Sequence, residues 1–279
     1  MNKYKAQTRA KALILYLLLL LLALLFLLPV FFLFTGAFKQ ESELFAVPFH
    51  WLPKKIIFDN FVEMYQSVPF LRYFRNTMII VVFNILGSLI SCSLIGYGFS
   101  RLDWPGRDKV FLIVIATMIL PYQVTLVPLY IMYTKIHWNG TFLPLIVPSY
   151  FGNAFFIFLM RQFMIGIPRE LSMASRIDGA NEFKTFLMVI IPNCKPVLVT
   201  VAIMSFMNSW KDFLGPLVFL ANDKYYTLSL AASMLRSNLD PNWNLLMALG
   251  TVMVIPVLIL FFILQKYFIQ GVTMSGIKG

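Results

Sequence analysis

Several polar side chains that could contact a solute lie inside or beside long apolar stretches. Asn153 interrupts one stretch, Asn208 and Trp210 lie in another, and Lys211 with Asp212 follows directly. Amide, indole and carboxylate groups can bind a polar solute, and ionisable residues inside a membrane segment often mark a transport pathway. Helix packing and a position near the membrane boundary are equally compatible with these residue types. We therefore keep Asn153, Asn208, Trp210 and Asp212 as candidate pathway residues, with helix packing as the alternative.

The residues that usually carry out catalysis or bind metals do not form a recognisable pattern. The two histidines, His50 and His137, and the two cysteines, Cys92 and Cys194, lack the spacing of a zinc site or a disulfide framework. An intramembrane enzyme would need clustered nucleophiles and bases, and neither histidine lies deep in an apolar stretch. The sequence also lacks the glycine-rich loop with Lys and Ser/Thr that holds nucleotide phosphates. We therefore expect a non-catalytic chain that binds neither a metal nor ATP itself.

The composition indicates a membrane protein. Of the 279 residues, 59% are apolar and only 13% are charged, whereas soluble domains carry about 25% charged residues. The net charge is +11, but the cations fall between apolar stretches, as positively charged cytoplasmic loops do. This distribution argues against nucleic acid as a partner and favours membrane lipid. We predict an all-α, polytopic fold.

The spacing of the charges predicts six transmembrane helices, because each needs about 20 mostly apolar residues. The first is too long for the apolar core of a cleavable signal peptide. The excess of cations predicts that both termini are cytoplasmic. The expected helices are 12–38, 71–100, 108–134, 138–161, 195–221 and 241–268. The expected cytoplasmic segments are 1–11, 162–194 and 269–279, and the expected external loops are 39–70 and 222–240.

The cytoplasmic segment 162–194 has the pattern of a helix–turn–helix. Pro168 suits the first turn of a helix, and Gly179 suits its end because glycine tolerates the left-handed conformation. A second helix is predicted from Asn181 to Ile191, directly before Pro192. The small residues on one surface of this helix–turn–helix would let a protein partner approach closely. The alternative is an amphipathic helix that rests on lipid headgroups.

This segment resembles the EAA loop of ABC-importer permeases, on the match of Ala174, Ser175, Gly179, Val189, Ile191 and Pro192. The consensus glutamate falls on Met173, and Glu170 lies one turn earlier. The stretches 152–163 and 208–213 and the ending 265–279 also resemble carbohydrate importers, in particular the G-type subunit of maltose permease.

The resemblance implies a type I ABC importer permease fold with a cytoplasmic coupling helix. It also implies four partners: an F-type permease, two ATP-binding subunits that hold ATP and Mg, and an extracytoplasmic sugar-binding protein. The residues implied in coupling to the ATPase are Glu170, Met173, Ala174, Ser175, Asp178, Gly179, Ala180 and Pro192 in the loop, and Thr273, Gly276, Lys278 and Gly279 in the tail.

The function that the resemblance implies is ATP-driven import of a carbohydrate across a bacterial or archaeal cell membrane. The substrate would be an oligosaccharide or a related polyol or sugar phosphate. The alternative is an ion-coupled secondary transporter of small solutes. Such a transporter would want a carboxylate at mid-membrane, and Asp212 is the one candidate in the predicted helices.

Overall fold

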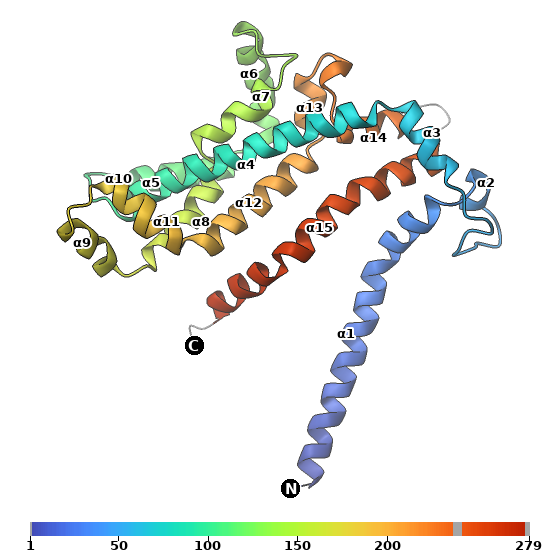
Figure 1. Cartoon of the computed structure of the whole chain (residues 1–279), viewed down its shortest axis with the longest axis horizontal. Coiled ribbons are helices and arrows are strands. Elements are labelled where there is room, and N and C mark those ends of the chain that lie inside the picture. The colour runs from blue at the N-terminus through green and yellow to red at the C-terminus, as the bar shows by residue number, and fades with distance from the viewer. Residues whose placement is uncertain (1, 237–241, 277–279) are drawn as a thin grey trace. The chain divides into compact units, whose positions relative to one another are not determined.

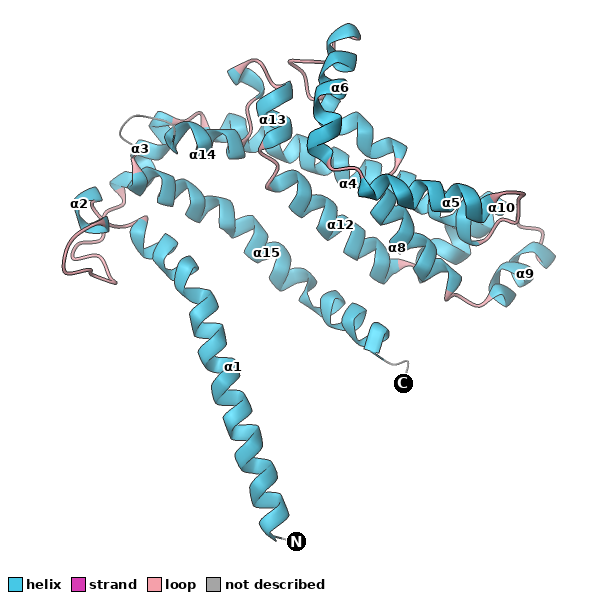
Figure 2. Ribbon diagram, turned by 180° about the vertical axis from the view of Figure 1, so that it is seen from behind, coloured by secondary structure: helices cyan, strands magenta, loops and turns pink. Residues whose placement is uncertain are grey.

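The computed structural model describes residues 2–236 and 242–276, and the side chains of residues 11–236 and 242–265. Within these ranges the chain forms helices and loops and contains no strand, as Figure 2 shows. The predicted all-α fold is therefore confirmed. The chain divides into two compact units, which are described separately: Met1–Pro69 with Ala232–Pro256, and Phe70–Ala231 with Val257–Gly279.

The first unit is held together at the end of its long helix by one buried amide. It contains α1 (Asn2–Gly36), α2 (Glu41–Leu44), α3 (Asp59–Ser67) and the first part of α15 (Trp243–Gly276). Asn60 Nδ2 donates to the carbonyls of Ala37 and Lys39 at 2.9 and 2.8 Å, and Asn60 Oδ1 accepts from Asn244 at 2.7 Å. One side chain thus joins α1, α3 and α15.

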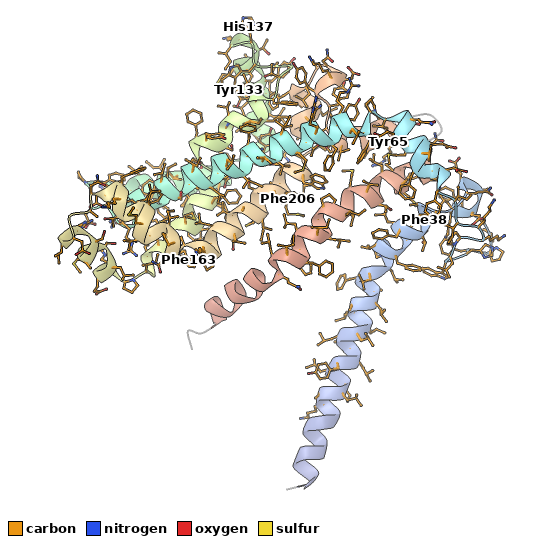
Figure 3. The ribbon with its side chains drawn as sticks, in the orientation of Figure 1. Phe38, Tyr65, Tyr133, His137, Phe163 and Phe206 are labelled. Atoms are coloured by element: carbon orange, nitrogen blue, oxygen red, sulfur yellow. The ribbon has the colours of Figure 1, made fainter. Side chains whose placement is uncertain are left out.

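Lys39 organises the loop that follows α1. Its side chain is fully buried, and its Nζ donates to the His50 carbonyl at 2.5 Å and lies 4.9 Å from the centre of the Phe49 ring. Burial lowers the pKa of Lys39, and the neighbouring Glu43 carboxylate opposes this shift. Phe38, the residue before Lys39, is labelled in Figure 3. Its ring packs against the rings of Phe58 and Phe61. The loop is therefore a folded structure.

The second unit is built around α4 (Phe70–Ser100), which packs against α8 (Ala154–Ile165) and α12 (Lys195–Trp210). Figure 1 shows these three helices side by side, with α9 and α10 near the C-terminal end of α4. The other elements of this unit are α5 (Arg107–Ala116), η1 (Thr117–Ile119), α6 (Tyr122–Lys135), α7 (Leu143–Ile146), η2 (Val147–Phe151), α9 (Arg169–Ile177), α10 (Glu182–Thr185), η3 (Phe186–Ile190), α11 (Ile191–Asn193), α13 (Leu214–Phe219) and η4 (Asp223–Tyr225). α14 (Leu228–Arg236) and α15 run from one unit into the other.

Small residues on α4 let its neighbours approach closely, as in many membrane helix pairs. A Cβ at Gly87 would lie 2.2 Å from Ser149 Oγ in η2, and one at Gly96 would lie 2.7 Å from Met160 Cβ in α8. Ser91 Oγ donates to the carbonyl of Ser149 at 2.9 Å. These close contacts fix α4 to both parts of the segment 143–165.

By length and apolarity, four helices of the described residues qualify as membrane spans, and six do so when two bent pairs are counted as one span each. The four are Lys11–Gly36, Phe70–Ser100, Leu143–Ile165 and Trp243–Gln265. The bent pairs are Arg107–Ile119 with Tyr122–Lys135, at 97°, and Glu182–Asn193 with Lys195–Trp210, at 81°.

The structure corrects the expectation of one continuous helix over 108–134. The chain turns sharply between η1 and α6, where Leu120 has an extended backbone (ψ 114°) and Pro121 precedes α6. A residue before proline avoids the helical region because the proline ring clashes with it. Apolarity alone does not reveal this break.

Two more expected helices have different bounds. The expected helix 195–221 ends at Trp210, and a second helix, α13, starts at Leu214, where Gly215 N donates to the Asp212 carboxylate at 3.1 Å. The expected helix 138–161 runs from Leu143 to Ile165 with an interruption at Gly152, whose φ of 94° favours glycine. The segment expected to begin at 162 therefore leaves the helix after Ile165.

Candidate functional site: a helical hairpin and a polar groove

The segment that resembles the EAA loop folds as a helical hairpin, defined here as residues 169–193. Its first arm, α9, ends where the sequence predicts, at Gly179 with a φ of 80°. Gly179 N donates to the Arg176 carbonyl and Ala180 N to the Ser175 carbonyl, both at 3.0 Å. This pair of nested bonds is a Schellman motif, in which glycine takes the left-handed position. The hairpin turn is thus encoded locally.

The second arm runs from α10 through η3 to α11 and begins at Asn181, whose Oδ1 accepts from Lys184 N at 2.8 Å. It contains one π-helical turn, Phe186–Ile190, which ends two residues before Pro192. Proline has no N–H to donate to the preceding turn. The backbone hydrogen bonds of the helix must therefore rearrange near Pro192. Near this turn, Asn193 Nδ2 donates to the Val189 carbonyl at 2.7 Å.

Tyr97 on α4 anchors the hairpin. Its hydroxyl donates to Glu182 Oε2 at 2.7 Å, and Arg176 Nε donates to Glu182 Oε1, also at 2.7 Å. The two hydrogen bonds lower the pKa of Glu182, and the bond to Glu182 raises the pKa of Arg176. The Tyr97 ring also packs against Phe186, with 5.2 Å between ring centres. One carboxylate therefore joins both arms of the hairpin to α4.

Arg101, directly after α4, holds the end of α8 from which the hairpin starts. Its guanidinium donates to the carbonyl of Met164 and, at 2.5 Å, to that of Ile167. The last carbonyls of a helix lack partners inside the helix, and a buried cation is well suited to them. Arg161 Nε on α8 donates in turn to the Phe99 carbonyl at 3.2 Å. The two helix ends are therefore joined in both directions.

Charged residues join the α4–α5 loop to the same region. Arg107 pairs with Asp103 at 2.8 Å, and Arg161 pairs with Asp108 at 2.9 Å. Arg169, in the first turn of α9, lies 4.0 Å from Asp103. These pairs are partly exposed and contribute little individually. Together they surround the start of the hairpin with alternating charges.

The outer face of the hairpin carries exposed apolar side chains. Met173, at the consensus glutamate position, is 51% exposed, and Ile177 is 86% exposed. Of the predicted coupling residues, Ser175 is half-buried and bonds Thr185 Oγ1 at 3.0 Å. Ala180 is also half-buried, whereas Glu170, Ala174, Asp178, Gly179 and Pro192 are exposed. Other exposed apolar side chains of the hairpin are Leu171, Phe183, Leu187 and Met188. Such a face fits a partner protein.

A second feature is a polar groove of about 280 Å³ in the second unit. It lies among α4, η2, the start of α8 and α12. Its apolar lining is Leu145, Pro148, Gly152 and Phe156, and its polar lining is Asn84, Ser88, Ser149, Asn153, Ser205, Asn208 and Ser209. Amides and hydroxyls both donate and accept hydrogen bonds. The groove can therefore bind a neutral solute with many hydroxyl groups.

The structure separates the four predicted pathway residues into two pairs. Asn153 and Asn208 both line the groove. Asn153 also starts α8, since its Oδ1 accepts from Phe155 N and Phe156 N. Trp210 is buried and stacks on Phe206, with ring centres 5.5 Å apart. The Asp212 carboxylate instead accepts a hydrogen bond from Gly215 N in the first turn of α13. Neither Trp210 nor Asp212 lines the groove.

Sequence reasoning missed most of the groove. Asn84 Nδ2 donates to Ser209 Oγ at 2.9 Å, and the hydroxyls of Ser88 and Ser205 lie 3.4 Å apart. Asn84 and Ser88 are four residues apart on one helix, as are Ser205 and Ser209, so each pair shares a helix face. Two such polar pairs inside apolar stretches were the signal that could have revealed the groove.

The predicted ATPase-contacting tail falls at the limit of the described chain. Thr273 and Gly276 belong to the last turns of α15, where only the backbone is described. Lys278 and Gly279 lie outside the described residues.

A helical membrane chain with a groove for a polar solute and an exposed hairpin for a partner has the features of a transport permease, and the family match assigns it to that non-catalytic class. The chain is a member of the family described as "Binding-protein-dependent transport system inner membrane component", which matches residues 93–274. The match includes the hairpin and most of the groove.

Curated relatives and solved structures agree with this assignment. The chain is 32% identical, over the full length of both chains, to the arabinooligosaccharides transport system permease AraQ of Bacillus subtilis. It is 31% identical to the melibiose/raffinose/stachyose import permease MelC of the same organism, covering 90% of this chain and 91% of MelC. A bacterial ABC transporter that imports alginate has the same fold, with a TM-score of 0.83 at 23% identity, covering 93% of this chain and 97% of that one.

Proposed function

We propose that this chain is a permease subunit of an ATP-driven importer of oligosaccharides. The observation that carries the proposal is the pairing, in one compact unit, of an uncharged polar groove with a partner-binding hairpin. The relatives AraQ and MelC are both named as permeases for oligosaccharides. A groove of amides and serine hydroxyls has the chemistry that such a substrate requires, because sugar hydroxyls both donate and accept hydrogen bonds.

The hairpin is the proposed contact with an ATP-hydrolysing subunit. Its exposed residues Met173 and Ile177 would enter the partner's cleft, and Glu170, one turn earlier than Met173, would supply the acidic contact. ATP drives a conformational change only when it binds one state better than the other, so the hairpin must be seated firmly. The tail residues Thr273, Gly276, Lys278 and Gly279 are proposed as a second contact.

The groove is proposed as this subunit's half of the translocation pathway. Asn208 and Asn153 line it from α12 and α8, together with Asn84 from α4. Trp210 is proposed to pack helices, and Asp212 to start α13. An F-type permease would supply the other half of the pathway.

The remaining partners follow from the same proposal. An extracytoplasmic binding protein would deliver the sugar, and two ATP-binding subunits would hold ATP and Mg, so that this chain needs no cofactor of its own. The cation distribution supports a cell-membrane location with both termini in the cytoplasm.

Uptake by reconstituted vesicles tests the proposed function. The chain is incorporated into liposomes with its permease and ATPase partners, and a panel of labelled oligosaccharides is offered with the binding protein outside. We expect uptake that requires both internal ATP and the binding protein. Uptake by this chain alone, driven by an ion gradient, would instead identify a secondary transporter.

The groove chemistry disfavours that alternative. Ion-coupled transporters place ionisable groups along the solute path. The polar lining of this groove consists of amides and hydroxyls, and the Asp212 carboxylate is bonded to the backbone of α13.

A further inference from the structure

The groove and the hairpin lie toward different ends of the same helix pair. On α4, Asn84 and Ser88 line the groove, and Tyr97 bonds the hairpin. The distance from Asn84 to Tyr97 along α4 is about 20 Å at 1.5 Å per residue. On α8, Asn153 borders the groove and Met164 is held by Arg101.

This helix pair is packed tightly along its length. A Cβ at Gly96 would lie 2.7 Å from Met160 Cβ and 3.3 Å from Arg161 N, so the two backbones are in close approach. Met160 and Met164 are fully buried. Closely packed interiors transmit displacement because they have little free volume. The pair therefore moves as one body.

The hairpin is attached to this body by buried apolar packing of Phe186 and Ile190 and by a small number of polar contacts. At the start of the hairpin, Pro168 directly follows Ile167, whose carbonyl accepts from Arg101. Farther along, Glu182 accepts from Tyr97 on one oxygen and from Arg176 on the other. The Glu182 carboxylate links the two arms of the hairpin. The Tyr97 hydroxyl thus connects this carboxylate to α4.

We infer that Tyr97 is a positioning residue that transmits movement of the hairpin to the groove through the α4–α8 pair. The inference rests on the proposed function, because it says how movement passes from the hairpin to the groove, the two sites of that function. Without the Tyr97 hydroxyl, the hairpin would still bind its partner through its exposed face. Movement of the hairpin would then reach the groove less efficiently, because the link from α4 to the Glu182 carboxylate would be missing while the apolar packing of Phe186 remains.

The experiment measures sugar molecules imported per ATP hydrolysed by the reconstituted complex. Tyr97→Phe removes the hydroxyl and keeps the ring against Phe186. We expect the ratio to fall about tenfold, the low end of the range for the loss of a hydrogen bond to a charged group, while assembly and ATP hydrolysis persist. Tyr133→Phe on α6 is the matched control, since Tyr133 is 4% and Tyr97 is 5% exposed. It should leave the ratio unchanged.

Glu182 provides a second set of variants if Tyr97→Phe impairs assembly. Glu182→Gln keeps an oxygen that accepts from Tyr97, and Glu182→Leu removes it. We expect the leucine variant to lower the ratio more than the glutamine variant. Amide hydrogen exchange over residues 169–193 should rise in the same order, because the hairpin loses its attachment.

The possible outcomes are distinct. An unchanged ratio in both Tyr97→Phe and Glu182→Leu overturns the inference, even if exchange in the hairpin rises. A wild-type complex that imports no sugar at the expense of ATP contradicts the proposed function instead. A lower ratio with intact ATP hydrolysis supports the role of Tyr97 in coupling.

Discussion

Gly96 on α4 faces Met160 on α8 so closely that an added Cβ would stand 2.7 Å from the methionine Cβ. Two residues farther along α4, Gly98 has no atom within 4 Å of its added Cβ. The two glycines thus have opposite surroundings on the same helix, and they offer a matched pair of substitutions.

Gly96→Ala should destabilise the protein, because overpacking a tight contact costs about 1–3 kcal/mol. Gly98→Ala should be neutral or stabilise the helix by about 0.5–1 kcal/mol, since alanine is the better helix former. Thermal unfolding in detergent checks both values. Equal unfolding temperatures for the two variants would contradict the close contact between α4 and α8.

Gly179→Val should abolish uptake without affecting membrane insertion. No side chain obstructs a Cβ at Gly179, but its φ of 80° costs a non-glycine residue about 1–2 kcal/mol. The strain would distort the hairpin turn rather than the helices around it. Gly179→Asn is the control, because asparagine tolerates this conformation. Normal uptake by the valine variant would remove the hairpin from the coupling mechanism.

Met173→Glu should be tolerated. Half of the Met173 side chain is exposed, at 51%, so the new carboxylate would be solvated in the isolated chain. We expect co-purification with the ATPase subunit and uptake to persist. Loss of co-purification would show that the partner's cleft around this position is apolar.

Asn208→Leu should reduce uptake while leaving thermal stability unchanged. Asn208 is an exposed residue that lines the groove, so its amide is available to a solute. Its neighbour Met207 lies about 100° away around α12, and Met207→Leu is the control. Transport assays with the sugar panel check the effect. Equal uptake by both variants would show that Asn208 is not part of the translocation pathway.

The attachment of the hairpin should weaken only in acid. The hydrogen bonds from Arg176 and Tyr97 lower the pKa of Glu182 below its usual 4.5. Stabilisation by an ionised carboxylate is complete above the pKa of the unfolded chain and is lost as the pH falls through the lower, folded value. Hydrogen exchange over 169–193 should therefore be unaffected by this group from pH 5 to pH 8. In Glu182→Gln, the increase in hydrogen exchange that Glu182 protonation causes in acid should disappear.

The hairpin could be predicted from sequence because local chemistry determines it. Gly179 ends α9, and Asn181 starts α10, through backbone geometry and hydrogen bonds within a few residues. The same holds for the apolar helices, whose length and composition are sufficient signals.

The groove and the helix bends depend on contacts between distant residues. Asn84 and Ser209 are 125 positions apart, and neither residue indicates alone that the other faces it. The position of Asp212 in an apolar stretch suggested a pathway, whereas its carboxylate accepts a hydrogen bond from Gly215 N in the next helix. A turn at Leu120 and Pro121 also interrupts a stretch whose apolarity is continuous.

The complete enclosure of Lys39 has a practical use. An amine-reactive reagent in the surrounding medium cannot reach its Nζ while the loop around His50 remains closed. Modification of this one amine, read by mass spectrometry beside the exposed Lys54 and Lys55, would report any opening of that loop.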